Sequence, residues 1–512
     1  MPVMPLAARR AVAVLGAMAL IAATGWSAAA ARAVVLRVSV GAAHGRPVAP
    51  GFLGLALEYR SIPGFTGSSP AGVNPVLVQL IRNLVPHGRP VLRIGGQTTD
   101  RTWWPVGGVS QPLGVTYSLT PRWMASARAL AQATDARYIL GVGLEANRSR
   151  IAAVEARQLL NGIGRRYIDS FEIGNEPELY TVVPWYRELH GAPIPWYSKE
   201  GRPIFSRPGG YGPSSFYAEF SRTLPTLPAL PITGPAVGLV PWIDGIRRFL
   251  APASRVRTVT WHAYGLNQCV TARSSPLYPT VANLLAPRAS RSLVEGISPY
   301  VALAHNVGGS FRIDEMNSVT CNGRLGVSNT LASALWVMDA LFTIAGAGID
   351  GVNIHTYQDA ANGLFDLDRA GGQWQASVHP LYYGAMMFAK AAPAGSRLLR
   401  IASGSQHDVR AWATIAPDHR VRVLLINDDV TRSALALVRR PLARGSASIE
   451  RLGASSAYAT GGVTLGGESF GARTHTGLLA PPQPKVLAPR SGSYAVTLPA
   501  ASATLVTLPP GS

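Results

Sequence analysis

The sequence predicts a (β/α)8 barrel followed by an antiparallel β-sandwich. Up to about residue 392, short β-rich apolar runs alternate eight times with amphipathic helical stretches, which is typical of a barrel. Beyond that point the helical period vanishes, and β-rich runs are separated by Gly, Pro, Ser and Asp, as in a sandwich. The chain of 512 residues is long enough for both, because a barrel needs about 250 residues.

The first 33 residues have the pattern of an export signal. Arg9 and Arg10 precede an apolar run at 11–23, and Ala31-Arg32-Ala33 has the small-x-small form of a cleavage site. A retained N-terminal anchor is the alternative, although the run is shorter than the ~20 residues of a membrane span. No later stretch has the pattern of a span. We therefore expect a secreted or extracytoplasmic protein.

Each following element can be assigned in order. A strand at Val34–Val40 has no barrel partner, so the segment 34–48 is expected to join the sandwich. The barrel is assigned to 49–392. Its predicted strands are Phe52–Tyr59, Val91–Gly95, Arg137–Val142, Ile168–Gly174, Ile232–Leu239, Val256–Tyr264, Ser310–Glu315 and Gly351–Tyr357. Its predicted helices are Pro75–Leu84, Pro121–Thr134, Arg150–Gly162, Ser214–Leu224, Pro241–Leu250, Ser292–His305, Thr330–Gly346 and His379–Ala391.

Long loops and a second domain complete the prediction. Loops 177–212 and 265–291 are rich in Pro, Tyr and Trp and are expected to form walls around a ligand. The sandwich is assigned to 393–512. Its clearest predicted strands are Ser396–Ala402, Val409–Ile415, Val421–Ile426, Ala434–Val438 and Tyr494–Leu498.

Two glutamates stand at the ends of the fourth and seventh predicted barrel strands. Residues 171–177 read FEIGNEP and residues 311–317 read FRIDEMN, which places Glu176 and Glu315 there. Barrel enzymes carry catalytic groups at the C-terminal ends of their strands. A pair of carboxyl groups in this setting predicts glycoside hydrolysis, where one protonates the leaving oxygen and the other attacks or activates water. For either residue, an exposed surface glutamate is the alternative.

Neighbouring strand residues are expected to support this pair. Glu172 shares a face with Glu176 by the period of two, so it should point into the barrel, where a charge needs a partner. Arg93 on the second strand is the predicted partner and a bridge to the site. Tyr264, which shares a face with His262 at the end of the sixth strand, is expected to hydrogen-bond a carboxylate; a core aromatic is the alternative. His355 is assigned to packing or orientation.

No metal or cofactor is predicted, and the two cysteines suggest a disulfide. The histidines are dispersed, and neither an HxxxH nor a CxxC spacing occurs. Cys269 and Cys321 are the only cysteines, and both follow predicted barrel strands in loops that should share one face. In an oxidising compartment they could pair and clamp two loops. Two unpaired thiols are the alternative.

The chain is strongly basic, with a formal charge of +20 that becomes +17 once Arg9, Arg10 and Arg32 leave with the signal. Such a field attracts polyanions. The arginines are scattered and show no nucleic-acid-binding motif, so an acidic polysaccharide or an anionic cell envelope is favoured over nucleic acid. Arginine-rich coding in a high-GC genome is the alternative.

Three motifs resemble the family 79 glycoside hydrolases, which include heparanase and bacterial β-glucuronidases. They are LRIGGQTTD at 92–100, FEIGNEP at 171–177 and DEMNS at 314–318, and the GGxxTD stretch is the most specific. The resemblance extends over about 34–512 and includes the order of domains. It implies a retaining mechanism with Glu176 as acid/base and Glu315 as nucleophile. It also implies sugar contacts from the residues Glu58, Thr99, Asp100 and Asn175.

The loop after Glu315 departs from the family pattern. Bacterial β-glucuronidases of the family seat the substrate carboxylate there with a tyrosine hydroxyl and backbone amides, whereas this chain reads SVTCNG at 318–323. Thr320 and Asn322 are therefore the expected substrate contacts, and Arg324 could add reach or be one more surface arginine. A glucuronide, a 4-O-methylglucuronide, a uronide within a polymer and a neutral sugar remain open.

The sequence thus predicts a retaining exo-β-glycosidase, with a β-glucuronidase as the first expectation and an acidic carbohydrate as its partner. A barrel glycosidase of the xylosidase or endoglycanase type, acting on a neutral glycan, is the first alternative. A non-catalytic protein that binds anionic glycan is the second. The oligomeric state stays open.

Overall fold

Eight parallel strands close into a barrel, which confirms the predicted fold class. In chain order they are β2 (Leu53–Glu58), β3 (Val91–Gly95), β6 (Arg137–Val142), β7 (Ile168–Ile173), β11 (Ile232–Gly234), β12 (Val256–Leu266), β13 (Ser310–Val319) and β14 (Gly351–His355). The last strand pairs with the first, β14 with β2, so the barrel has no free edge. All eight C-terminal strand ends therefore meet on one face.

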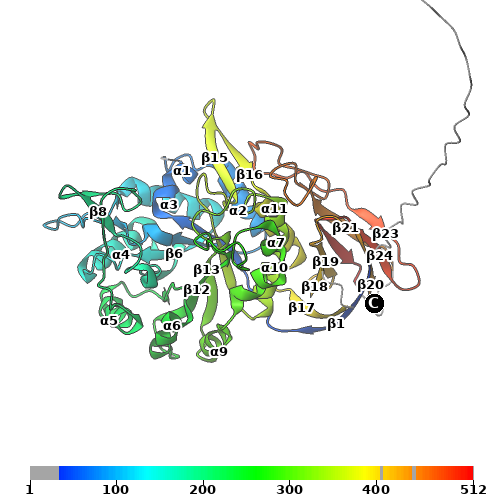
Figure 1. Cartoon of the computed structure of the whole chain (residues 1–512), viewed down its shortest axis with the longest axis horizontal. Coiled ribbons are helices and arrows are strands. Elements are labelled where there is room, and N and C mark those ends of the chain that lie inside the picture. The colour runs from blue at the N-terminus through cyan, green and yellow to red at the C-terminus, as the bar shows by residue number, and fades with distance from the viewer. Residues whose placement is uncertain (1–33, 68, 404–407, 441–444, 511–512) are drawn as a thin grey trace, which may run out of the picture. The chain divides into compact units, whose positions relative to one another are not determined.

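The structure is a computed structural model that describes residues 34–67, 69–403, 408–440 and 445–510. The predicted signal segment 1–33 lies outside the described residues. Figure 1 shows helices around the outside of the barrel strands. Within the described part of the chain, no helix combines the length and hydropathy that crossing a membrane requires.

The helices begin where capping residues and prolines predict. The main ones are α2 (Pro75–Leu84), α3 (Pro121–Thr134), α4 (Ser149–Ile163), α5 (Pro213–Thr223), α9 (Ser298–Asn306), α10 (Leu331–Gly346) and α11 (Pro380–Ala391). The Asn74 side chain accepts hydrogen bonds from the first turn of α2, and Thr120 does the same for α3. Four short helices add to them: α1 (Ile62–Thr66), α6 (Val240–Ile243), α7 (Val281–Leu285) and α8 (Pro287–Arg291).

Two predicted helices and one predicted strand are shorter than expected. The helix expected at 241–250 is α6 followed by a 3-10 turn at Asp244–Phe249. The helix expected at 292–305 is split at Gly296, which has a left-handed φ of +77°. A 3-10 turn at Ser292–Val294 precedes this glycine, and α9 follows it. The strand β11 ends before Pro235, which has no amide hydrogen for a sheet ladder.

The barrel loops carry small sheets that the sequence did not predict. The loop after β7 folds into β8 (Tyr186–Leu189), β9 (Ala192–Ile194) and β10 (Arg202–Ile204). A hairpin of β15 (Phe365–Ala370) and β16 (Gln373–Val378) follows β14, and it stands out in yellow in Figure 1. The short pair β4 (Thr102–Trp103) and β5 (Tyr117–Ser118) lies in the loop after β3.

The C-terminal domain is a ten-stranded, mainly antiparallel sheet system. It contains β17 (Arg397–Ser403), β18 (Val409–Ile415), β19 (Val421–Asn427), β20 (Ala434–Arg439), β21 (Ala447–Gly453), β22 (Thr464–Leu465), β23 (Lys485–Leu487), β24 (Tyr494–Leu498) and β25 (Ser502–Leu508). The N-terminal strand β1 (Val34–His44) pairs antiparallel with β17 and parallel with β20. The expectation that this strand crosses over to the second domain is therefore confirmed.

Candidate active site

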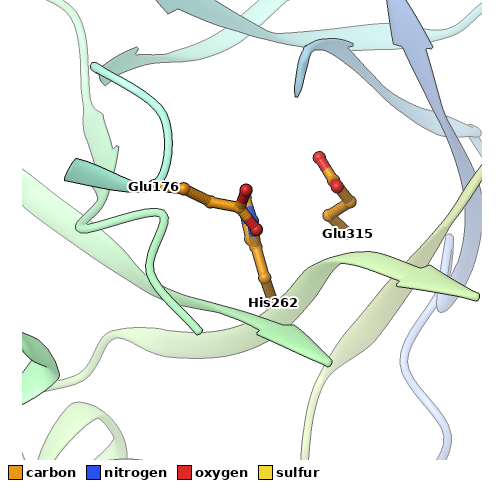
Figure 2. Close-up of side chains that lie close together, drawn as sticks. All are labelled: Glu176, His262 and Glu315. Atoms are coloured by element: carbon orange, nitrogen blue, oxygen red, sulfur yellow. The ribbon is translucent and has the colours of Figure 1, made fainter. Parts of the chain in front are cut away.

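Glu176 and Glu315 face each other above the C-terminal end of the barrel, with His262 beside Glu176 (Figure 2). Glu315 lies on β13, whereas Glu176 follows β7 in a left-handed conformation with a φ of +45°. A carboxylate oxygen of each glutamate and a ring nitrogen of His262 all lie within 4.8 Å of one another. The Glu176 side chain is 24% exposed and that of Glu315 only 7%, so Glu176 is the one open to solvent.

Arg93 on β3 holds the floor of this site together. Its fully buried guanidinium contacts Glu172 Oε2 at 2.7 Å, Glu315 Oε2 at 2.7 Å, Asn175 Oδ1 at 2.8 Å and Asp314 Oδ2 at 3.2 Å. The contact with Glu172 is the one expected from the sequence. Burial and the charge of Glu172 raise the pKa of Asp314 well above its usual range, while Arg93 and His262 oppose this shift. One cation thus links β3, β7 and β13 beneath the two glutamates.

The surroundings of Glu315 favour its ionised form. Burial alone would raise its pKa, but the positive charges of His355, His262 and Arg93 outweigh burial and hold the pKa well below its usual range. The Tyr264 hydroxyl adds a hydrogen bond to Oε1 at 2.8 Å, the supporting contact expected from the sequence. Glu315 is therefore ionised, and Arg93 and Tyr264 fix its orientation by holding one carboxylate oxygen each.

His262 is the main residue that sequence reasoning left without a role. Its Nδ1 lies 3.0 Å from Glu176 Oε1, and its Nε2 lies 3.6 Å from Asp314 Oδ1. Burial would lower the pKa of His262, but the negative charges of Glu315 and Asp314 raise it to about 9. The imidazolium therefore donates to Glu176 at neutral pH. Its place two residues before Tyr264, on the same face of β12, was the available signal.

Glu58 reaches the site through His355. Its Oε1 accepts from His355 Nε2 at 3.1 Å, and its Oε2 accepts from the Thr98 amide at 2.9 Å. His355 Nδ1 in turn lies 3.1 Å from the Tyr264 hydroxyl and 3.4 Å from Glu315 Oε1. His355 thus orients two active-site groups, Tyr264 and Glu315. Of the two roles expected for it, packing and orientation, these contacts support orientation.

Two predicted sugar-binding residues are buried in the structure. Thr99 is fully buried against Gly141. Asp100 accepts four hydrogen bonds, from the Leu144, Glu145 and Asn175 amides and from the Tyr180 hydroxyl. The 3-10 turn at Gly96–Thr98 directs both side chains inward. Asp100 therefore fixes loops around the site, and it also lines a pocket with Asn175 and Glu176. The predicted contacts of Thr99 and Asp100 with a sugar stay predictions.

The loop after β13 is held by its own polar contacts. The Thr320 hydroxyl accepts from the Gln268 amide at 3.0 Å and donates to Asn267 Oδ1 at 3.2 Å, so the predicted substrate contact is engaged elsewhere. Asn322 Oδ1 accepts a hydrogen bond from the hydroxyl of Tyr357, a residue to which the sequence analysis gave no role in the site. The guanidinium carbon of Arg324 lies over the Tyr278 ring, 5.4 Å from its centroid.

The predicted disulfide between Cys269 and Cys321 stays a prediction. Cys269 and Cys321 are free, and their sulfur atoms lie 3.9 Å apart, whereas a disulfide needs about 2.05 Å. The two loops do share a face, as expected, but the thiols are only in contact.

Glu176, His262 and Glu315 form the one group of possible metal ligands found among the described residues. Their donors are already committed to protein partners. Arg93 and Tyr264 donate hydrogen bonds to the two carboxylate oxygens of Glu315. Below a pH of about 9 His262 is protonated, so its ring nitrogens have no lone pair for a metal ion. The cations beside these carboxylates also repel a metal ion. The arrangement suits proton transfer and nucleophilic attack instead.

Fold and site together define a (β/α)8-barrel protein with two facing carboxylates at the ends of its fourth and seventh strands. No protein-family model matches the chain, and no curated protein matches it. The family 79 resemblance therefore stays a prediction.

Several solved structures share the fold. A 4-O-α-L-rhamnosyl-β-D-glucuronidase from Fusarium oxysporum is 20% identical, covers 93% of this chain and 100% of its own, and has a TM-score of 0.67. A family 51 arabinofuranosidase from Xanthomonas axonopodis is 16% identical, with 93% and 100% covered and a TM-score of 0.63. For an α-L-arabinofuranosidase from Thermotoga maritima these values are 12%, 92%, 99% and 0.61. The likeness extends over both domains.

Proposed function

We propose that the protein is a retaining β-glycosidase in which Glu315 is the nucleophile and Glu176 the acid/base. The observation that carries this proposal is the separation of the two carboxylates, whose oxygens approach within 4.8 Å. Retaining enzymes hold the two groups about 5–5.5 Å apart, whereas inverting enzymes need about 6.5–9.5 Å to admit a water between them.

The environments of the two groups agree with these roles. Glu315, kept ionised by its cationic neighbours, attacks the anomeric carbon while Glu176 protonates the departing oxygen. In the second step Glu176 takes a proton from water, whose oxygen attacks the anomeric carbon and releases Glu315 as a carboxylate. Its exposure gives that water access. Tyr264 and Arg93 keep the nucleophile oriented throughout.

For the substrate we propose a β-glucuronide cleaved from the chain end. The family 79 resemblance supports this, as does the fold shared with a protein described as a rhamnosyl-glucuronidase. The bacterial β-glucuronidases of family 79 use a tyrosine hydroxyl to hold the substrate carboxylate, and Thr320 stands in that loop here. Tyr357, whose hydroxyl contacts Asn322, supplies a tyrosine hydroxyl beside the same loop. The amides of Cys321 and Asn322 make no hydrogen bond within the described part of the chain, which leaves them free for a carboxylate.

Glu176→Gln and Glu315→Gln test the proposal. Each should lower turnover of an aryl β-glucuronide by at least about 10²–10⁴-fold, the usual contribution of such a group, without unfolding the protein. Glu200→Gln, on an exposed loop residue, is the matched control and should retain full activity. Circular dichroism checks the fold. Near-normal rates in either active-site variant would contradict the assignment.

A panel of aryl glycosides tests the substrate. We expect kcat/KM for the β-glucuronide to exceed that for the β-xyloside, β-glucoside and α-L-arabinofuranoside. Tyr357→Phe should reduce this preference by about tenfold, because a hydrogen bond to a charged group is worth about 1.5–3 kcal/mol. A neutral glycoside as the best substrate would favour the alternative enzyme class. Salt-sensitive polymer binding without any hydrolysis would favour the non-catalytic alternative.

A further inference from the structure

Two thiols meet beside the loop that follows the nucleophile strand. Cys269 follows β12 and Cys321 follows β13, and both residues are exposed. Their sulfur atoms lie 3.9 Å apart, although the residues are 52 positions apart in the sequence. Oxidation to a disulfide would bring the sulfurs to about 2.05 Å, a movement of about 2 Å. The pair is therefore close enough to be joined by a small adjustment.

The two loops that carry the thiols are already connected by hydrogen bonds. The Thr320 hydroxyl contacts the Gln268 amide and Asn267 Oδ1, and the Thr320 amide donates to Leu266 O at 3.2 Å. The Cys269 amide donates to the same Asn267 oxygen at 2.8 Å. A disulfide here would add a covalent bond between loops that these contacts already align.

On the Cys321 side, the loop leads to the nucleophile. Cys321 and Asn322 have left-handed φ angles of +53° and +71°, which are unfavourable for residues other than glycine, so the turn relies on its neighbours to hold it. Asn322 accepts from the Tyr357 hydroxyl, and the Tyr357 ring lies against that of His355, with centroids 5.1 Å apart. His355 Nδ1 in turn lies 3.4 Å from Glu315 Oε1.

The same turn holds the two amides that the proposed function assigns to the substrate carboxylate. The amides of Cys321 and Asn322 make no hydrogen bond within the described part of the chain. The first of them belongs to one of the two thiol residues. Any restraint on the Cys321 side chain is therefore a restraint on the peptide units that would hold the substrate.

We propose that Cys269 and Cys321 form a redox-dependent clamp on this loop: the disulfide holds the Cys321 and Asn322 amides in place, and its reduction loosens them and weakens the binding of uronides. This inference rests on the proposed function. It adds a regulation that the two catalytic carboxylates alone do not provide.

The clamp closes by thiol–disulfide exchange with an external disulfide. One cysteine thiolate attacks a sulfur of that compound, whose S–S bond breaks and releases one thiol. The second cysteine then attacks the mixed disulfide, releases the other thiol and forms the bond between Cys269 and Cys321. Two protein thiols are oxidised, the external disulfide is reduced to two thiols, and the two protons end on the released thiols.

Wild type treated with glutathione disulfide or with dithiothreitol provides the test. Peptide mapping should find a Cys269–Cys321 link only in the oxidised protein. We expect KM for an aryl β-glucuronide to be about three- to tenfold lower in the oxidised form, with kcat nearly unchanged, because a preorganised loop loses less freedom on binding. The kcat/KM for an aryl β-xyloside, which has no carboxylate, should be the same in both forms.

Cys269→Ser is the matched control, since it cannot form the bond and leaves the Cys321 backbone unaltered. Its KM should equal that of the reduced wild type under both conditions, with intact mass confirming that Cys321 carries no glutathione. Oxidation should also raise the Tm of the wild type but not that of the variant, because the disulfide closes a long loop.

Several results would overturn the inference. Equal KM for the glucuronide in both redox forms of an active wild type refutes the clamp and leaves the proposed function standing. An equal change for the β-xyloside shows a general effect on the fold, and the lack of a linked peptide shows that the bond does not form. If the wild type hydrolyses no glycoside, the proposed function fails. The rise in Tm caused by D-glucuronate then compares the two redox forms, and equal rises would refute the clamp by itself.

Discussion

At the scale of single residues, one buried arginine determines whether the site can exist. Arg93 is fully buried and contacts three acidic side chains and Asn175. A buried charge is tolerated only when it is paired, so each of these groups depends on the others. The site is therefore coupled to the stability of the barrel interior.

Replacing Arg93 with Met should destabilise the fold by about 3–5 kcal/mol, because it leaves Glu172 and Glu315 buried without their cation. Urea unfolding followed by fluorescence measures the change. Combining it with Glu172→Met should recover part of the loss, since the orphaned charge is removed as well. Equal stability of Arg93→Met and wild type would contradict this account of the barrel floor.

His262 predicts how stability depends on pH. Its folded pKa of about 9 is higher than the ordinary value near 6.5, so its contribution is complete below about pH 6.5 and is lost as pH rises through 9. We expect the free energy of unfolding to fall by up to about 3 kcal/mol across this window. The decrease should be smaller in His262→Gln. Identical pH dependence in the two proteins would contradict the assignment of a charged imidazole.

Strand periodicity predicted the residues that point into the barrel, but not those in loops. Glu172 and Tyr264 make the contacts that their positions on strands suggested. Thr99 and Asp100 follow a strand end, where a short turn rather than a period sets the direction of a side chain. The Tyr357 contact with Asn322 joins two loops that are distant in sequence, and no local pattern encodes it.

At the scale of elements, the close contact of α10 and α11 depends on a glycine. A Cβ on Gly384 in α11 would lie 2.3 Å from Ala334 O and 2.7 Å from the Val337 side chain of α10. Both helices are almost completely buried, so neither can move away freely.

Gly384→Ala should therefore destabilise the protein by about 1–3 kcal/mol, the usual cost of overpacking, although helix propensity alone favours Ala by about 1 kcal/mol. Thermal unfolding measures the net effect. Gly210→Ala is the control, since nothing lies within 4 Å of its added Cβ, and its Tm should be nearly unchanged. A higher Tm for Gly384→Ala would show that propensity dominates.

Element positions were predictable where hydrophobic periods are long and bounded by caps. All eight barrel strands begin within one residue of the predicted start, although β11 ends early, because buried parallel strands are continuous apolar runs. The sheet β8–β10 and the hairpin β15–β16 were missed, since the strands of the first have only three or four residues and all five strands are partly exposed. Such strands carry little periodic signal.

At the scale of the whole molecule, the barrel and part of the sheet domain share one hydrophobic core, while other residues of the sheet domain form a second core of their own. The cluster that includes the barrel interior and α10 also contains Leu424 and Ile426 of β19 and Leu505 of β25. At this junction Trp412 of β18 stacks on Phe342 of α10, with ring centroids 5.4 Å apart. Its Nε1 donates to Asp339 at 2.9 Å.

This shared core predicts that the described part of the chain unfolds as one cooperative unit, and that damage in the sheet domain destabilises the barrel. Trp412→Ala should lower the unfolding free energy by about 2–3 kcal/mol, somewhat less than the about 3–5 kcal/mol of a fully buried tryptophan, because Trp412 is only partly buried. Loss of the proposed glycosidase activity and loss of ellipticity on heating should coincide in both proteins. Val486→Ala, at a site 76% exposed on β23, should leave the midpoint unchanged. Two separate calorimetric transitions, with the catalytic one unmoved by Trp412→Ala, would show that the barrel is stable without the sheet domain and would contradict a single core.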